Sequence, residues 1–212
     1  ISRKSNRKSV KQKMINQRLH TSALLFLLLF NSCKHSVENK LVVNALFTDH
    51  MVLQQKENVA FWGTYTPNKK ITVRGSWGKE STCVSDNKGH WKLNLSTPEA
   101  GGPYQVSIAT KTSRVLIKDV LIGEVWLASG QSNMEMDFDY CCNTTDFSEY
   151  ERTNANYPNI RMIKVKKQLN STPLQEFEGS WKKAVGDSIT RFSAAAYFFA
   201  KRHHKELDIP IG

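Results

Sequence analysis

Short segments of alternating apolar and polar residues fill the chain between Leu41 and Lys118. In 91–95 and 104–108 every second residue is apolar, as expected of strands with one face on a core and the other in water. We expect strands at 41–47, 59–62, 71–75, 91–95, 104–108 and 115–117, with turns at 67–68, 86–89 and 101–103. Short strands punctuated by turns predict a β-sandwich domain over residues 41–118.

The apolar pattern changes its period after Asp119. An apolar run at 120–127 is followed by a polar loop, by a second apolar segment at 160–165 and by helical spacing over 188–207. The helix would carry one apolar stripe, formed by Ile189, Phe192, Ala196, Phe199 and His203. Strand, loop, strand and helix in this order predict the first portion of a doubly wound α/β domain over 119–212.

Composition and charge exclude two classes of protein. With 40% hydrophobic residues in 212, the chain is suited to a packed globular fold and not to disorder. The formal charge of +11 is concentrated at the start, because residues 1–32 hold seven Lys or Arg and no acid. Residues 33–212 carry 23 basic and 19 acidic side chains, a net charge of only +4. We therefore expect no nucleic-acid partner.

The basic start of the chain has the parts of an export signal. Met14 is the first methionine, and the apolar core at 23–30 is too short to span a bilayer. We expect 1–13 to be a non-native extension and 14–33 a signal peptide. The small residue before Cys33 resembles a lipoprotein cleavage box, so that Cys33 would be lipidated and form the sole membrane anchor. The alternative is an ordinary signal peptide that is cleaved near Ser32.

Four cysteines are too few for a disulfide framework. Cys83, Cys141 and Cys142 are expected to be free thiols or to pair with sequence that is not present. No Cys or His spacing suits a metal, so we expect no metal site. The export signal and the possible lipid anchor imply an exported protein, in the periplasm or as an outer-membrane or cell-surface lipoprotein.

The segment Gly130–Met134 presents Ser132 directly after the apolar run, between the amide side chains of Gln131 and Asn133. A serine that follows a buried strand and a glycine turn suits a nucleophile at the carboxyl edge of a sheet. Met134 replaces the second glycine of the Gly-x-Ser-x-Gly elbow, which argues against the α/β-hydrolase fold.

Residues 117–136 closely resemble the sialate O-acetylesterase family, a branch of the GDSL/SGNH hydrolases. Three further stretches, at 47–54, 100–104 and 192–199, agree with that family in the right order. The resemblance implies that Ser132 is the nucleophile and that its backbone N–H is one oxyanion donor. It also implies acyl transfer on O-acetylated carbohydrates, with no metal or organic cofactor.

In that family an Asp-x-x-His pair near the carboxyl end activates the serine. We expect this pair to fall beyond Gly212, where residues 209–212 begin another strand. His50 and His90 lie beside turns, and His203 and His204 lie at a helix end, so we name no base in the chain. The catalytic site is then incomplete within these residues.

Other polar residues near the serine have two possible roles. Gln131 and Asn133 could bind a sugar or brace the turn. Glu135 and Asp137 are expected to be solvated or to cap a helix, and not to form a glycosidase pair.

We therefore expect an exported serine carbohydrate esterase. The alternative is a non-catalytic carbohydrate-binding lipoprotein that keeps a remnant of the esterase domain. Trp62 and Trp91 are expected in the sandwich core, and Trp77 is the candidate for an exposed sugar platform.

Overall fold

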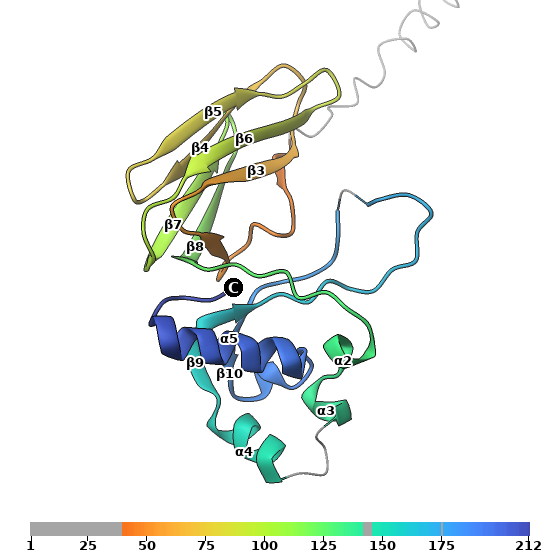
Figure 1. Ribbon diagram of the computed structural model, residues 1–212. Coiled ribbons are helices and arrows are strands. Elements are labelled where there is room, and N and C mark those ends of the chain that lie inside the picture. Colours follow the sequence, from red (N-terminus) through yellow and green to blue (C-terminus); the bar gives the residue numbers. More distant parts are fainter. Residues whose placement is uncertain (1–39, 142–145, 175) are drawn as a thin grey trace, which may run out of the picture. The chain divides into compact units, whose positions relative to one another are not determined.

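The computed structural model describes residues 40–212 with the exception of 142–145 and 175. Residues 40–212 form one compact unit of mixed α/β structure with several sheets (Figure 1). The predicted extension at 1–13, the signal peptide at 14–33, Cys33 and Cys142 lie outside the described residues. Among the helices of the described part, none is long and apolar enough to cross a membrane.

Two β-sheets occupy the amino-terminal part of this unit. The five-stranded sheet has the order β2-β8-β7-β4-β5, and the three-stranded sheet has the order β1-β3-β6. Their strands are β1 Val42–Val43, β2 Val52–Gln54, β3 Asn58–Thr64, β4 Lys70–Gly75, β5 Glu80–Val84, β6 His90–Ser96, β7 Gly101–Ala109 and β8 Arg114–Gly123. All pairs are antiparallel except β2 with β8.

Both sheets contribute side chains to a single apolar core. In β4, β6 and β7 the buried residues alternate with exposed or half-exposed neighbours. Fully or nearly fully buried members include Phe61, Ile71, Val73, Leu95, Val106 and Ile108. Each buried aliphatic or aromatic side chain contributes about 1.5 to 3 kcal/mol relative to exposure. The alternation in the sequence thus reflects the burial seen in these strands.

Several strand boundaries differ from the sequence expectation. The polar edge strand β5 was not predicted, because none of its residues is buried. The glycines expected to form a turn at 101–103 instead open β7, since Gly101 pairs with Ile122. The segments expected at 115–117 and 120–127 are partly one strand, because β8 continues through residue 118 to Gly123.

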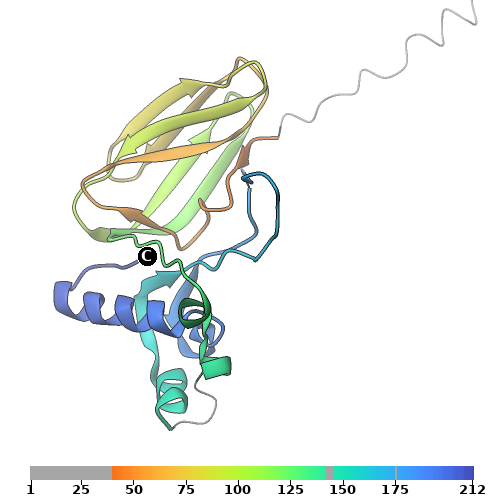
Figure 2. The same ribbon diagram turned by 45° about the vertical axis from the view of Figure 1, so that its right-hand side comes forward.

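The carboxyl-terminal part contains short helices and a second core. Its elements are α2 Ser132–Glu135, α3 Phe138–Cys141, α4 Asp146–Asn154, β9 Asn156–Met162, β10 Lys182–Val185, the 3₁₀ turn η1 Gly186–Ile189 and α5 Ala194–Leu207. β9 and β10 are antiparallel. Phe138, Ile160, Ile189 and Tyr197 are buried in this core. In both views α5 crosses β9 at a large angle (Figure 2).

The predicted helix at 188–207 begins later than expected. Ser193 is the N-cap of α5, and its Oγ accepts a hydrogen bond from Ala196 N at 3.2 Å. The predicted apolar stripe was also partly wrong. Tyr197 is fully buried, whereas Phe199 is 41% exposed.

The last residues of the chain join two segments that are far apart in the sequence. Ile211 forms parallel bridges with Glu124 on one side and with Ile160 on the other. The segment after β8, the chain end and β9 therefore run in the same direction. Their carboxyl ends lead to the Ser132 turn and to Lys164, so these two features lie at the same edge.

Candidate functional site

The segment that leads to Ser132 is fixed by the end of the chain. Trp126 N donates to Gly212 O at 2.9 Å, and Gly212 N donates to Glu124 O at 2.8 Å. Residues 127–133 that follow are exposed. Ser132 is the first residue of α2, where its backbone N–H has no acceptor within the helix. The structure thus presents the Ser132 hydroxyl to solvent at the end of a held strand.

Gly130 is required by the tight turn before the serine. A Cβ at this position would lie 2.8 Å from Met134 Cβ, closer than real contacts allow. Gln131 is the N-cap of α2, but its side chain makes no capping hydrogen bond. Gln131 and Asn133 are both exposed, and in the part of the chain that the structure describes their amides form no hydrogen bond. Their predicted contact with substrate stays a prediction.

The start of α5 contacts the residues that follow Ser132 in the turn. Ala194 N donates to Met136 O at 2.9 Å, and the Ser193 hydroxyl lies 3.4 Å from Met134 Sδ. Asp137 Oδ1 accepts from Tyr140 N at 3.1 Å, which is the capping role expected for it. Sequence reasoning missed the role of Ser193, which has no catalytic signature of its own.

Two glutamines anchor the strand before the turn. Gln54 Nε2 and Gln55 Nε2 donate to the Glu124 carboxylate at 3.1 and 2.8 Å, and Gln54 Oε1 accepts from Val125 N at 2.9 Å. These hydrogen bonds, from Gln55 first and then Gln54, lower the pKa of Glu124 by more than desolvation raises it. Ala100 N donates to Gln55 Oε1 at 3.0 Å.

The 117–136 stretch, which resembles one family, is in contact with the three other stretches that resemble the same family. The 47–54 stretch pairs with β8 through β2, and the 100–104 stretch through β7. The 192–199 stretch holds the turn through Ser193 and Ala194. Each of them contacts the 117–136 stretch, which ends in the Ser132 turn. Two of these contacts hold β8 and the third holds the turn itself, so the exposed Ser132 turn at the end of this stretch is the candidate active site.

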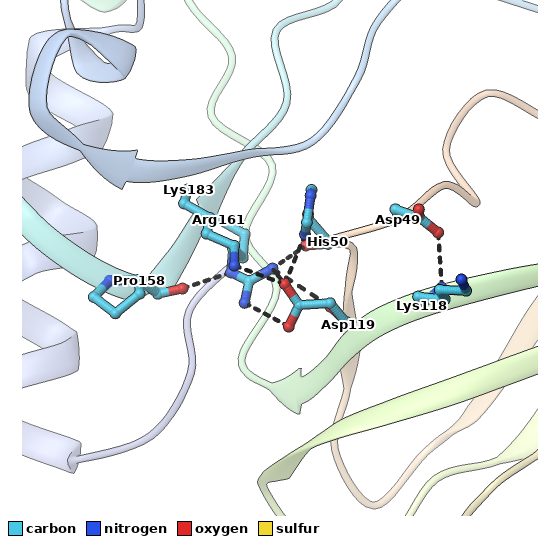
Figure 3. A network of polar contacts seen from close by, with 7 residues as sticks. All are labelled: Asp49, His50, Lys118, Asp119, Pro158, Arg161 and Lys183. Carbon is cyan, nitrogen blue, oxygen red and sulfur yellow. Dashed lines mark hydrogen bonds and ion pairs between the residues drawn. The ribbon is translucent and has the colours of Figure 1, made fainter.

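A polar network surrounds the carboxylate of Asp119, which lies within β8 (Figure 3). Arg161 from β9 binds the Asp119 carboxylate through two hydrogen bonds of 3.1 Å each. Lys183 Nζ from β10 lies 2.9 Å from Asp119 Oδ2, and His50 Nδ1 lies 2.7 Å from the same oxygen. The network joins the five-stranded sheet to β9 and β10.

Burial and charge act in opposite directions on Asp119. Desolvation raises the pKa of its carboxyl, but hydrogen bonds from Arg161, Lys183 and His50 together with the Arg161 charge hold it well below its usual range. The Arg161 side chain is only 3% exposed and also donates to Pro158 O at 2.6 Å. Asp119 is therefore an ionised counterion for a buried guanidinium.

No histidine in the described residues is hydrogen-bonded to Ser132. His50 binds Asp119, and His90 Nδ1 lies 3.5 Å from Asp86. His203 stacks on Trp126 with ring centroids 5.6 Å apart, and His204 bonds to Ile209 O at 2.7 Å. His203 also lies about 15 Å along α5 from Ser193, at 1.5 Å per residue.

The described residues contain no group of three or more His, Cys, Asp or Glu side chains that could hold a metal. Trp77 is not the exposed platform that the sequence suggested, because its Nε1 donates to Ser96 O at 2.8 Å and its ring contacts Tyr104 edge-on. Trp91 is buried as expected, and Trp62 is half-buried. Trp126, six residues before Ser132 in the chain, is instead 51% exposed.

Comparison with known proteins adds a family assignment. The chain is 31% identical to sialate O-acetylesterase from Mus musculus over 182 residues, which is 77% of this chain and 33% of that protein. It is 29% identical to the human sialate O-acetylesterase, with 76% and 34% covered. No family model matches.

A solved structure agrees with these relatives. The crystal structure of a carbohydrate acetylesterase from Xanthomonas citri superposes with a TM-score of 0.76 at 33% identity, covering 82% of this chain and 39% of that one. The chain thus spans about a third of the length of the curated relatives it matches.

Proposed function

Because the chain belongs to the sialate O-acetylesterase family, we propose that it carries the nucleophile of an exported carbohydrate esterase. The observation that supports this most strongly is that the other three family-like stretches each contact the stretch that ends in the Ser132 turn, two of them at β8 and one at the turn itself. The relatives are named for removing acetyl esters from sialate, and the solved neighbour is named for carbohydrate acetyl esters. The proposed substrate is accordingly an O-acetylated carbohydrate.

Ser132 would act by acyl transfer. Its Oγ attacks the carbonyl carbon of the acetyl ester while a base takes its proton. When the tetrahedral intermediate collapses, the protonated base gives that proton to the sugar oxygen, and the sugar leaves as an alcohol. Water then attacks the acetyl-enzyme and releases acetate. The Ser132 N–H, unpaired within α2, is suited to donate to the oxyanion.

The base would come from sequence that follows Gly212. This proposal is supported by the contacts of the histidines in the described part, since each of them contacts a group other than Ser132. It is also supported by the fact that the match covers only 33% of the mouse relative. Loss of the base costs about 10⁶ in kcat in a serine protease, so the 212-residue chain is expected to be nearly inert.

The architecture fits an esterase of the SGNH type. The two sheets that share one core would form a β-sandwich domain over 41–118, and 119–212 would form the first part of a doubly wound domain. The parallel bridges of Ile211 with Glu124 and Ile160 support the second assignment.

Export is a further part of the proposal. An apolar core at 23–30 followed by Cys33 favours a signal peptide and a lipid anchor. In a bacterial host, labelled fatty acid should appear on the protein and disappear in Cys33→Ser. Unlabelled protein in the soluble fraction would contradict the anchor.

The second candidate is a non-catalytic carbohydrate-binding lipoprotein, and the observation that favours it is the same absence of a histidine beside Ser132 among the described residues. Acetate release from O-acetylated sugar separates the two candidates. A protein that continues past Gly212 with an Asp-x-x-His should show turnover that falls at least about 10³-fold in Ser132→Ala.

Ser129→Ala is the matched control, because Ser129 is an exposed serine just before the same turn. Its turnover should equal that of the parent protein. Equal activity in Ser132→Ala and the parent would contradict the esterase proposal.

A further inference from the structure

The charge of the chain is unevenly divided between its two parts. Residues 41–118 hold 10 basic and 5 acidic side chains, a net charge of +5. Residues 119–212 hold 11 basic and 13 acidic side chains, a net charge of −2. The excess of basic residues therefore belongs to the two sheets that share the first core, and a one-sided charge of this kind favours an anionic partner.

Several connections of the two sheets meet at one end. β4 begins at Lys70 and β8 begins at Arg114, and because both strands are antiparallel to β7 they begin at the same end. Tyr65, in the connection that leads from β3 to β4, donates its N–H to Gly89 O at 2.8 Å, between β5 and β6. Its hydroxyl oxygen lies 2.9 Å from Thr112 Oγ1, in the turn between β7 and β8. The three connections therefore lie side by side.

This end carries a group of exposed basic side chains, which we call the cationic end. Its members are Lys69, Lys70, Lys88, Lys111 and Arg114. Within the part of the chain that the structure describes, none of these five side chains forms an ion pair. Arg114 Nε donates at 2.8 Å to Ser107 Oγ, which is a neutral acceptor. The five positive charges are therefore left for an anion from outside.

Acidic side chains do not cancel this charge. Asp86 is the one acidic residue in the three connections, and its Oδ1 accepts from Lys88 N and His90 N at 2.8 Å each. Its carboxylate is thus used by its own turn. The opposite end of the sheets is balanced instead, because it holds the ion pairs of Lys56 with Glu99 and of Arg74 with Glu80.

The chain enters the sheets at the cationic end. Val42 in β1 pairs with Thr64, the last residue of β3, so the exposed Lys40 comes just before this point. Cys33 stands seven residues before Lys40 in the sequence, and seven residues reach at most about 25 Å. A lipid on Cys33 would therefore keep the cationic end within reach of a bilayer surface.

We propose that the cationic end binds the phosphate groups of an anionic lipid bilayer, as a second membrane contact beside the proposed anchor at Cys33. Basic residues next to an acyl anchor strengthen membrane attachment, and each one near an anionic surface strengthens binding about fivefold. The orientation toward the membrane rests on the proposed anchor. The charge rests on the two sheets alone and does not depend on the chemistry of Ser132.

Sedimentation with lipid vesicles tests this surface on residues 40–212, which form one compact unit with its own cores. This part of the protein contains neither the basic start of the chain nor Cys33, so the result is independent of acylation. Vesicles of equal parts phosphatidylglycerol and phosphatidylcholine should bind it, and vesicles of phosphatidylcholine alone should not. Lys70→Gln combined with Lys111→Gln should weaken binding about 25-fold, because two cations are lost. Added NaCl should also weaken binding through screening.

Lys79→Gln combined with Lys92→Gln is the matched control. It removes the same charge from exposed positions outside the cationic end. Charges that lie more than a Debye length from the bilayer are screened, so this double variant should bind within about threefold of the parent.

Equal binding to anionic and neutral vesicles would overturn the proposal, and so would an equal loss of affinity in the two double variants. Binding to soluble polygalacturonate without binding to anionic vesicles would also overturn it, because the partner would then be an anionic polysaccharide.

Discussion

Removal of the Asp119 charge should destabilise the protein more than any other change in its network. Asp119→Asn keeps the shape of the side chain but leaves the guanidinium of Arg161, which is 3% exposed, without a carboxylate. Breaking a buried ion pair from one side costs about 3 to 5 kcal/mol. Because Asp119 itself is 26% exposed, water can partly replace it, and we expect about 3 kcal/mol.

Urea unfolding followed by tryptophan fluorescence measures this cost. With an m value of about 2 kcal/mol/M, the midpoint should fall by about 1.5 M urea. Lys183→Met is the matched control, because its side chain is 41% exposed and its ion pair with Asp119 is worth about 1 kcal/mol or less.

A double substitution identifies the cause. Adding Arg161→Met to Asp119→Asn removes the unpaired buried charge, so the double variant should be more stable than Asp119→Asn alone. A midpoint for Asp119→Asn no lower than that of Lys183→Met would refute the argument.

Three other outcomes follow from the structure. The stability of the parent protein should fall as the pH drops below about 4, because the pKa of Asp119 is depressed on folding and its stabilising contribution is lost on protonation. In that pH range, the free energy of unfolding of Asp119→Asn should depend less steeply on pH. Identical pH profiles of the two proteins would count against this. Gly130→Ala should lower the esterase turnover of the longer protein at least about tenfold, because the added Cβ displaces the turn. The free energy of unfolding should change by less than about 1 kcal/mol, since the turn is exposed. Unchanged turnover would show that the turn tolerates the added methyl group. Gly123→Ala should instead lower stability, because its Cβ would lie 2.0 Å from Pro210 O and would push the chain end away from the end of β8. An unchanged urea midpoint would contradict this.

Local periodicity predicted the strands whose alternate residues face the core. β4, β6 and β7 were found because their buried and exposed positions alternate. β5 was missed because an edge strand without a buried residue has no such pattern. The start of α5 was misplaced because Ile189 of η1 and Phe192 continue the helical spacing, although the chain first forms a 3₁₀ turn.

The Ser132 turn could be predicted from the sequence, but the long-range hydrogen bonds and ion pairs that hold its surroundings could not. The Gly130–Met134 segment predicts an exposed serine after a glycine turn, and Ser132 is indeed exposed at the start of α2, while its role as nucleophile stays a prediction. The contacts of Gln55 with Glu124 and of Arg161 with Asp119 join residues far apart in the chain, which no local pattern encodes. The sequence gives one sign of the buried Arg161, because this arginine stands between two apolar residues of a predicted strand.

Covalent trapping tests most directly whether Ser132 is an esterase nucleophile. A protein that continues past Gly212 is mixed with an activated acetyl ester, quenched in acid within the first turnover and digested for mass spectrometry. The account predicts one acetyl group on the peptide containing Ser132, absent in Ser132→Ala and retained in Ser129→Ala. Rapid turnover with the acetyl group on another residue, or on none, would contradict it.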